Sequence, residues 1–357
     1  MGRLAAVAVS SSATADASEP ASHARPVTLA DIAREAGTSA STASRALSGR
    51  GYVSPVARER LLQAAERLGY VPNASARTLK QKTSRVVGVV VSDLGNQFYA
   101  RLAAGIEQAL RESGYQMMLL GDNSQSEEEL AAARAFLAMR APGVIMTPVG
   151  SAATALLHRQ GVAVVEVDRR LADVPCDAVL TDNERGAREA TEHLLSLGHE
   201  RIALLVVETE WTSDVGRLRG YRAALGDAGV EPDPDLVVAV EPGASDVDER
   251  VASLLDRRPT AIFAANNQLA ETAWRLIRER GLRLPRDISL VAFDDLPWME
   301  MVDPGITAVA QPTFELGRRA AELLLRRAVA PDRPPQVEQL EPSLVVRGST
   351  GAPRAGA

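Results

Sequence analysis

The chain has 357 residues, of which 46% are hydrophobic, and its 40 Lys and Arg against 46 Asp and Glu give a formal net charge of −6. This length favours more than one domain. The single cysteine, Cys176, excludes an intrachain disulfide and a cysteine-rich metal site, and no stretch approaches the roughly twenty apolar residues of a membrane-spanning helix. We therefore expect a cytoplasmic protein with no membrane partner.

Residues 1–26 are rich in Ala and Ser, and we expect them to form a disordered tail or to follow a misplaced start codon. The apolar run Leu4–Val9 after Arg3 has six residues, fewer than the roughly seven to fifteen of a secretory signal. A second disordered tail is expected at 348–357.

The segment from Val27 to Leu47 predicts two short helices joined by a tight turn. Thr28 stands where an N-cap oxygen belongs, Gly37 can supply the positive φ that ends the first helix, and Ser39 can cap the second. Apolar residues recur at helical spacing, as Leu29, Ile32, Ala33 and Ala36 in the first helix and Ala43, Ala46 and Leu47 in the second.

The outward face of the second helix suits duplex DNA. Its members are Ala40, Ser41, Ser44 and Arg45. Hydroxyl groups and helix N-terminal amides contact phosphate, and an arginine can bind guanine O6 and N7 with two hydrogen bonds. A plain helical hairpin is the alternative for this segment by itself.

Pro55 is predicted to open a third helix and Gly69 to end it. The apolar stripe of this helix is predicted to be Val56, Leu61, Leu62, Ala65 and Leu68. Further on, Asn73 can cap a short helix through Leu79. We therefore place a DNA-binding domain at 27–72 and a hinge helix with its linker at 73–84.

Charge is divided unevenly along the chain. Residues 27–82 hold nine Lys or Arg against four Asp or Glu, a net of +5, and residues 1–26 balance to zero. Residues 83–357 therefore carry −11. A basic head on an acidic body indicates nucleic-acid contacts confined to one end.

Between 85 and 347, short apolar strands alternate with amphipathic helices, which is the pattern of a parallel α/β fold. The expected strands are VVGVVV, QMMLLG, GVIMTP, VAVVEVD, RIALLVV, LVVAV, TAIFAAN and ISLVAFD, and the helices include Tyr99–Ser113, Glu127–Met139, Glu184–Leu197 and Gln268–Arg280. Because about 270 residues exceed one comfortable domain, we expect two similar lobes with a cleft between them.

Polar residues fall at the C-terminal ends of the predicted strands, where open α/β sheets bind ligands. Asp168 ends one strand with Arg169 beside it, Asn266 and Asp294 end two others, and Arg217 follows a fourth. Carboxylates accept from adjacent hydroxyls, and guanidinium groups donate to ring oxygens or carboxylates, which favours a sugar or a sugar acid. Trp211 and Trp298 are candidates for stacking on a sugar face or for packing within a lobe.

Motifs for enzymatic chemistry are missing from the sequence. There is no glycine-rich phosphate loop, no dinucleotide fingerprint after the first strand and no nucleophile elbow. The four histidines lack metal-ligand spacing. Asp294 and Asp295 point opposite ways at a strand end, and Glu129 is assigned to a capping box with Ser126. We expect no catalytic residue, metal or cofactor.

From the helix-turn-helix through Tyr70-Val71-Pro72-Asn73 to Leu79, the chain resembles the lactose and galactose repressor (LacI/GalR) family of transcriptional regulators. The resemblance extends from Val27 to about Arg347. It implies an N-terminal all-α helix-turn-helix headpiece and an α/β two-lobed core of the periplasmic-binding-protein type, with parallel sheets and more than one crossing between the lobes. It also implies a homodimer on a palindromic double-stranded DNA operator.

The resemblance also implies roles for individual residues. The implied DNA contacts are Thr28, Ser39, Ala40, Ser41, Thr42, Ser44, Arg45, Tyr70, Asn73 and Leu79, with Leu79 as a minor-groove wedge. The implied effector contacts are Arg217, Asn266 and Asp294, then Phe98 and Asp168, and Arg169, Trp211 and Trp298 complete the candidate site. The chain departs from the family pattern at Asn267, where Asp commonly follows the effector asparagine, and at Ser48, where Asn often ends the recognition helix.

These observations predict a sequence-specific repressor of a carbohydrate-utilisation operon, released from its operator by a sugar or sugar-acid effector. An exported solute-binding protein is the alternative from another class, but it needs an export signal and no DNA-binding head. Within the family, the alternative is a corepressor-dependent, purine-type regulator, and an enzyme ranks third.

Overall fold

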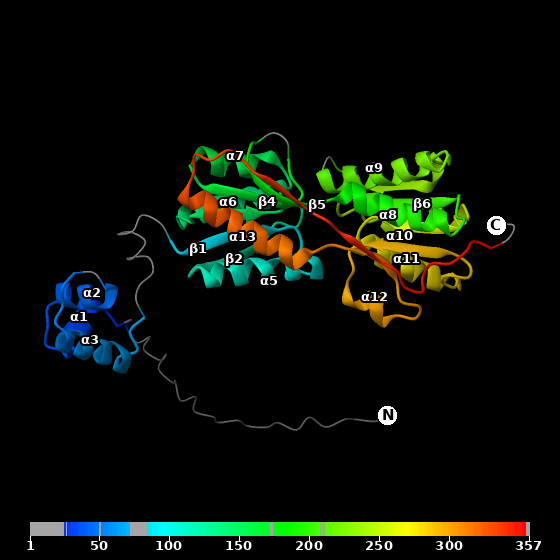
Figure 1. The fold of residues 1–357 in the computed structure, drawn as a ribbon. Coiled ribbons are helices and arrows are strands. Elements are labelled where there is room, and N and C mark those ends of the chain that lie inside the picture. The colour runs from blue at the N-terminus through cyan, green and yellow to red at the C-terminus, as the bar shows by residue number, and fades with distance from the viewer. Residues whose placement is uncertain are drawn as a thin grey trace, which may run out of the picture. The chain divides into compact units, whose positions relative to one another are not determined.

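The computed structural model describes residues 25, 27–49, 51–71, 84–171, 174–207, 209 and 211–354. The chain separates into two compact units, Met1–Ala74 and Ser75–Ala357 (Figure 1). Most of the expected N-terminal tail and the expected hinge helix, with Asn73 and Leu79, lie outside the described residues.

The first unit contains α1 (Leu29–Glu35), α2 (Ala40–Ser48) and α3 (Pro55–Arg67). The predicted caps are confirmed, since the hydroxyls of Thr28 and Ser39 each accept a hydrogen bond from a backbone amide three residues on, at 3.4 and 3.2 Å. Gly37 and Gly69 have φ of +62° and +63°, and glycine reverses the chain there without steric strain. The fully buried contacts between the helices are made by Ile32, Ala43, Leu61 and Ala64, with Ala33 and Ala46 nearly as buried.

The predicted apolar stripe of α3 is wrong at two positions. Val56 and Leu62 are 69% and 47% exposed, whereas Leu61 and Ala64 are fully buried. With about 3.6 residues per turn, positions 57, 61, 64 and 68 share one face, and positions 56 and 62 project about 100° to either side of it. The face that α3 buries against the other two helices is therefore narrower, and has smaller side chains, than its hydrophobic residues alone indicate.

The second unit contains two six-stranded sheets, one in each lobe. The N-terminal lobe has the strand order β11-β5-β4-β3-β1-β2, and the C-terminal lobe has the order β12-β10-β9-β8-β6-β7. The first sheet consists of β1 (Val86–Val91), β2 (Gln116–Gly121), β3 (Gly143–Met146), β4 (Ala163–Asp168), β5 (Asp177–Thr181) and β11 (Val337–Leu340). The second consists of β6 (Ile202–Val207), β7 (Val237–Val240), β8 (Ala261–Ala264), β9 (Ser289–Phe293), β10 (Thr307–Ala310) and β12 (Ser343–Val345).

These strands pair in parallel, except that β12 runs antiparallel to β10. The eight strands expected from the sequence are confirmed, and β5, β10, β11 and β12 are additional. The family resemblance predicted repeated crossings, and the chain passes between the lobes after β5, after β10 and after β11.

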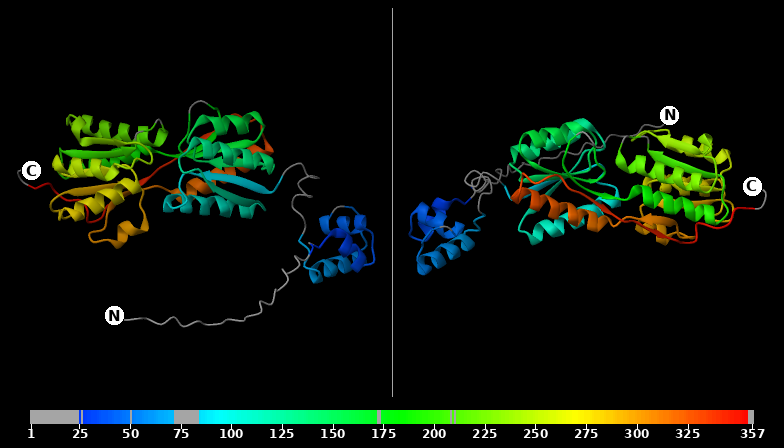
Figure 2. Two further views of the ribbon diagram at one scale, coloured as in Figure 1. Left: turned by 180° about the vertical axis from the view of Figure 1, so that it is seen from behind. Right: turned by 45° about the horizontal axis from the view of Figure 1, so that its top comes forward.

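Helices cover both faces of each sheet (Figure 2). In the N-terminal lobe, α5 (Gln97–Glu112) and α13 (Thr313–Val329) cover one face, and α6 (Ser126–Ala138) and α7 (Ser151–Arg159) cover the other. In the C-terminal lobe, α8 (Asn183–Ser196) and α9 (Thr212–Asp227) lie opposite α10 (Val247–Asp256) and α11 (Asn267–Glu279), with the short α12 (Pro297–Met301) after β9 and a 3-10 turn at Pro234–Leu236. The four helices expected from periodicity correspond to α5, α6, α8 and α11.

Glycines let pairs of helices pack at backbone distance. A Cβ atom at Gly317 of α13 would lie 2.1 Å from the carbonyl oxygen of Leu102 in α5, and one at Gly105 would lie 2.0 Å from that of Phe314. The same arrangement joins α8 and α9, where a Cβ atom at Gly220 would lie 2.2 Å from a carbonyl oxygen. Only glycine fits these positions without moving a helix, so α13 is an integral part of the N-terminal lobe.

The prediction of a disordered tail from residue 348 onward is wrong for residues 348–354. Ser349 is fully buried. Its hydroxyl donates to the Leu290 carbonyl at 2.6 Å and accepts from the Thr307 amide at 2.8 Å. The Gly351 carbonyl lies 2.8 Å from Nε2 of His199. Hydrogen bonds rather than apolar contacts fix this segment, which is why its composition gives no sign of order.

Candidate functional site

The outward face of α2 carries the expected small and basic side chains. Ala40, Ser41 and Arg45 are exposed, and Thr42 and Ser44 are half-buried. The Arg45 side chain is steadied by a hydrogen bond of 3.3 Å from Nε to the Ser41 carbonyl. Because the side chain is exposed, its other guanidinium donors can reach phosphate or a base edge.

Two other expected DNA contacts, Thr28 and Tyr70, make contacts that stabilise the DNA-binding domain itself. The hydroxyl of Thr28 lies 2.6 Å from Oδ2 of Asp31, and the same carboxylate accepts from the Thr28 amide at 2.9 Å. These hydrogen bonds and the nearby Arg25 hold the pKa of Asp31 well below its usual range. Tyr70 packs against the head's apolar core and is half-buried.

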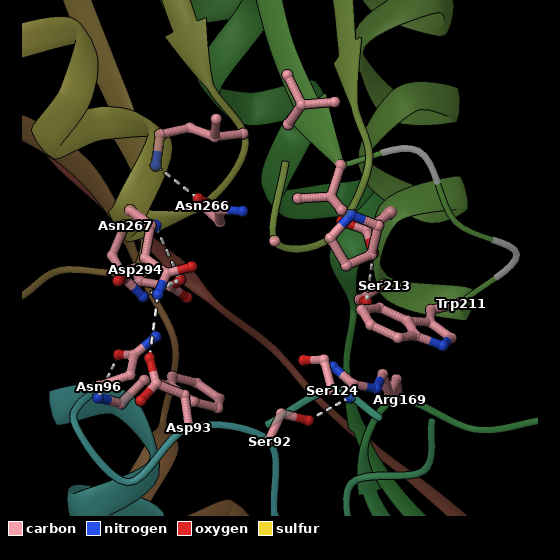
Figure 3. Close-up of a pocket in the computed structure, with 18 of the residues that line it drawn as sticks. Ser92, Asp93, Asn96, Ser124, Arg169, Trp211, Ser213, Asn266, Asn267 and Asp294 are labelled. Carbon is pink, nitrogen blue, oxygen red and sulfur yellow. Dashed lines mark hydrogen bonds between the residues drawn. The ribbon is translucent and has the colours of Figure 1, made fainter. Parts of the chain in front are cut away.

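A cavity of about 670 Å³ lies between the two lobes of the second unit. It is formed where strands of both sheets end, as the sequence predicts for ligand binding. Asp168 directly ends β4 and Asp294 directly follows β9, and both adopt positive φ, +72° and +74°. Left-handed backbone at non-glycine residues is costly and is typical of binding sites. Figure 3 shows Asp294, Asn266 and Asn267 from the C-terminal lobe opposite Asp93 and Asn96 from the N-terminal lobe.

Arg217 is buried on α9 and held on three sides. Its Nε donates to Oδ1 of Asn183 at 2.8 Å, and its Nη1 donates to the Ala265 carbonyl at 2.6 Å. The guanidinium carbon lies 3.9 Å from the centre of the Phe293 ring. The cation is therefore oriented before any ligand arrives, and Arg217 lines the cavity.

Asp294 is held by two amide side chains. Nδ2 of Asn267 donates to its Oδ2 at 2.9 Å, and Nε2 of Gln311 donates to its Oδ1 at 2.5 Å. An aspartate at position 267 has no donor for this contact, so the departure from the family pattern here creates a neutral partner for Asp294. Asn266 caps α11 by accepting from the Leu269 amide at 2.8 Å.

Asp168 differs from Asp294 in that its carboxylate accepts no hydrogen bond from any described residue. It is 7% exposed. Burial raises the pKa of its carboxyl to about 6, nearby Arg169 and Arg217 lower it, and the negative charges of Asp294 and Asp214 raise it further. A buried carboxylate at a cavity wall with free lone pairs is a ready acceptor for ligand hydroxyls.

Trp211 and Arg169 join the two lobes across the cavity. The guanidinium carbon of Arg169, from the N-terminal lobe, lies 3.6 Å from the centre of the Trp211 ring, from the C-terminal lobe. The indole N–H donates to the Val149 carbonyl of the N-terminal lobe at 3.3 Å. At another place on the cavity wall, Nε2 of Gln268 donates to Oδ2 of Asp93 at 3.1 Å. The lobes are thus bridged at two separate places.

The structure brings together seven of the eight candidate effector residues from the sequence. Phe98, Asp168, Arg169, Trp211, Arg217, Asn266 and Asp294 line the cavity. Trp298 does not, and of its two alternatives packing within a lobe holds: its ring packs 5.8 Å from that of Trp274 against the apolar core of the C-terminal lobe. The residue lies in α12, which packs against its own lobe, so the ring never reaches the cavity.

Several cavity residues were not predicted. They are Asp93, Asn96, Asn123, Ser124, Gln125, Ser213, Asp214, Glu241 and Gln311. Most follow the ends of β1, β2, β7 and β10, so the strand-end argument identifies them once it is applied to every strand. Asn123 and Ser124 both have positive φ, +51° and +58°.

The predicted capping box between Ser126 and Glu129 is wrong. Glu129 is buried, and its two carboxylate oxygens accept from the Val149 and Gly150 amides at 2.8 and 3.1 Å. Burial raises the pKa of Glu129 to about 7. The side chain therefore fixes the loop before α7 instead of capping α6.

Comparisons with known proteins agree with this architecture. A model of bacterial regulatory proteins of the lacI family matches residues 28–73, and a periplasmic binding protein-like domain matches residues 191–350. The transcriptional regulator DegA of Bacillus subtilis is 33% identical over 90% of this chain and 98% of its own length. The chain belongs to the lacI family. It is therefore a DNA-binding transcriptional regulator.

Other members of the lacI family match over similar lengths. The regulator CelR of Thermobifida fusca is 37% identical over 90% of this chain and 98% of its own. A solved CelR–cellobiose complex aligns with a TM-score of 0.69 at 32% identity, covering 90% of this chain and 99% of that chain. The lac repressor dimer bound to operator aligns with a TM-score of 0.81 at 29% identity, covering 92% and 100%.

No described helix is long and apolar enough to cross a membrane. Within the same residues, no group of three His, Cys, Asp or Glu side chains is placed to hold a metal ion.

Proposed function

We propose that this lacI-family regulator is a cytoplasmic repressor of a carbohydrate-utilisation operon, which binds a palindromic operator as a homodimer and is released by a sugar. The observation that carries the sugar is the cavity's donor and acceptor set. A free carboxylate at Asp168, an oriented cation at Arg217 and the amide of Asn266 match a ring that presents hydroxyls in several directions. The Phe98 ring supplies an apolar surface beside them.

The relatives support the same ligand class. One similar structure is a complex of CelR with cellobiose, and another is a family member with bound ribose. A ribose operon repressor of Haemophilus influenzae is 29% identical over 90% of this chain. The transcriptional repressor PurR of Vibrio atlanticus is 28% identical over the same share. A corepressor-dependent, purine-type regulator is the alternative within the family, and the sign of the ligand's effect on operator affinity distinguishes the two.

Release requires that the effector bind two conformations of the regulator with different affinity. Closure of the lobes is the available two-state movement, because the three chain crossings act as a hinge and the cavity lies between the lobes. Arg217 and Asp294 belong to the C-terminal lobe, whereas Asp168 belongs to the N-terminal lobe. A sugar that bonds to both sides therefore favours the closed form.

Operator titration with and without sugar tests this function. The variants Asp294→Ala and Arg217→Ala are expected to bind operator as the parent does but to show no release by a sugar that releases the parent. A typical coupling of about 1 to 3 kcal/mol corresponds to a roughly 5- to 150-fold loss of operator affinity in the parent. Arg222→Ala is the matched control, since Arg222 is an exposed arginine on the same helix α9.

Two outcomes contradict parts of the proposal. If both variants respond at the parent's sugar concentration, the effector binds elsewhere. If the ligand tightens operator binding, the protein depends on a corepressor. If Asp294→Ala is unfolded by circular dichroism, Asp294→Asn, which keeps the size of the side chain, takes its place in the titration.

A further inference from the structure

The described wall of the cavity has an excess of acidic side chains. Five carboxylates line it, those of Asp93, Asp168, Asp214, Glu241 and Asp294, against the two guanidinium groups of Arg169 and Arg217. The described lining contains no lysine and no histidine. In a partly buried cavity these charges are poorly screened, so an anion entering it meets a net repulsion.

The two arginines are already committed to protein acceptors. Nε of Arg169 donates to the Pro148 carbonyl at 2.7 Å, and its Nη2 donates to the Ser92 hydroxyl at 2.5 Å. Nε of Arg217 donates to Asn183 at 2.8 Å. Side-on binding of a carboxylate needs a free Nε–H together with a neighbouring Nη–H. Neither arginine has that side-on pair free. Arg217 can meet a ligand only end-on, through Nη1 and Nη2, and its Nη1 already donates to the Ala265 carbonyl.

The cavity wall contains a carboxylate, that of Asp168, whose oxygens are available to accept hydrogen bonds from a ligand. The Asp168 carboxylate has no hydrogen bond to a described residue, although it is more than nine-tenths buried. Its electrostatic neighbours are the cations of Arg169 and Arg217 and the carboxylates of Asp294 and Asp214. A ligand carboxylate or phosphate near Asp168 would add a like charge to this group, whereas a ligand hydroxyl would donate to it.

From this arrangement we infer that the effector is a neutral sugar, and that sugar acids and sugar phosphates are excluded. The inference rests on the proposed function and narrows its ligand class. It also replaces the sugar acid that the sequence left open, because only the structure shows the acidic lining and the protein acceptors that already use Nε of both arginines.

Matched ligand pairs test the inference on the full-length protein. Thermal shift and isothermal titration at pH 7.5 compare cellobiose with cellobionic acid, and glucose with glucuronic acid and glucose 6-phosphate. We expect each neutral sugar that binds to do so at least about tenfold more tightly than its anionic partner, since one unscreened like-charge contact suffices for that ratio.

The variant Asp168→Asn tests the cause of the selectivity. Removing this charge should lower the ratio of neutral to anionic affinity, even if the neutral sugar itself binds more weakly. Glu231→Gln makes the same change in charge at an exposed position outside the described lining, and it should leave the ratio as in the parent. An unchanged ratio in Asp168→Asn overturns the assigned role of this carboxylate.

The remaining outcomes separate this inference from the function on which it rests. Equal or tighter binding of an anionic sugar, with release of the operator, overturns the inference and leaves the sugar-responsive repressor intact. No thermal shift and no operator release with any neutral or anionic sugar of the panel overturns both.

Discussion

The stacking of Trp211 on Arg169 predicts that one side chain sets the balance between open and closed lobes. Trp211→Ala removes a cation–π contact to a buried guanidinium, which is worth about 2 kcal/mol when desolvated. It also removes the indole hydrogen bond to the Val149 carbonyl, which contributes about 1 kcal/mol. The combined loss of about 3 kcal/mol shifts the equilibrium toward the open form by on the order of 100-fold.

A ligand that binds the closed form must then supply this free energy itself. We expect the dissociation constant of an effector sugar to rise by up to about 100-fold in Trp211→Ala. In Trp211→Phe, which keeps an aromatic ring but loses the N–H donor, we expect a rise of about tenfold or less. Isothermal titration measures the affinities, and small-angle X-ray scattering of the ligand-free protein measures lobe opening.

Trp274 provides the matched control. Its ring lies 5.0 Å from the Arg278 guanidinium, and both residues belong to the C-terminal lobe. Trp274→Phe therefore alters a tryptophan–arginine contact that does not join the lobes, and scattering and affinity should both match the parent. If Trp211→Ala loses affinity while its ligand-free scattering is that of the parent, Trp211 acts by touching the ligand and the bridging argument is refuted.

Three further predictions concern packing, pH and salt. Gly317→Ala places a Cβ atom 2.1 Å from a carbonyl oxygen, so urea unfolding should show a loss of about 1 to 3 kcal/mol, whereas Gly226→Ala, in open space on α9, should gain up to about 1 kcal/mol. Because burial raises the pKa of Asp168 from 3.8 to about 6, its ionisation destabilises the folded state, and this group's contribution to stability falls as the pH rises from about 4 to 6. Because sugar hydroxyls donate to the ionised form of Asp168, calorimetry should show sugar affinity falling as the pH drops from 7 to 5. In Asp168→Asn the affinity should not change over this pH range. Operator affinity should fall by orders of magnitude between about 50 and 200 mM salt. Binding of the operator by two DNA-binding heads of a homodimer is contradicted by a complex with one chain per operator. It is also contradicted if Arg45→Ala keeps its specific affinity.

The DNA-binding domain at 27–72 shows which features of a fold can be predicted from neighbouring residues alone. The caps at Thr28 and Ser39 and the glycines after α1 and α3 follow from the sequence, because each acts through its own neighbours in the chain. The error at Val56 and Leu62 has a different origin. Which apolar side of α3 faces inward depends on where two other helices lie, and hydrophobicity in one segment carries no information on that.

In the two-lobed core, too, some features could be predicted from neighbouring residues and others could not. Continuous apolar runs reveal the central strands, but β11 reads VEQL and is half exposed, so only its pairing with β5 makes it a strand. The strand-end rule located Asp168 and Asp294 correctly, because a parallel sheet gathers such ends at one edge. The sequence could not decide between stacking and packing for Trp298, because its short helix turns the ring into its own lobe. Nor could the sequence show that Arg169 and Arg217 donate to acceptors far away in the chain.

The order of strands in the two sheets has a consequence for synthesis on the ribosome. The N-terminal lobe lacks a core helix and an edge strand until α13 and β11, at residues 313–340, have been made, although its other strands are complete by residue 181. The head has its own apolar core, complete by Tyr70. At about 5 to 20 residues per second, the roughly 270 residues between these points take on the order of 15 to 55 seconds to translate. During that interval the nascent chain carries a DNA-binding head whose two-lobed core is not yet complete, and a product ending before α13 keeps that state permanently.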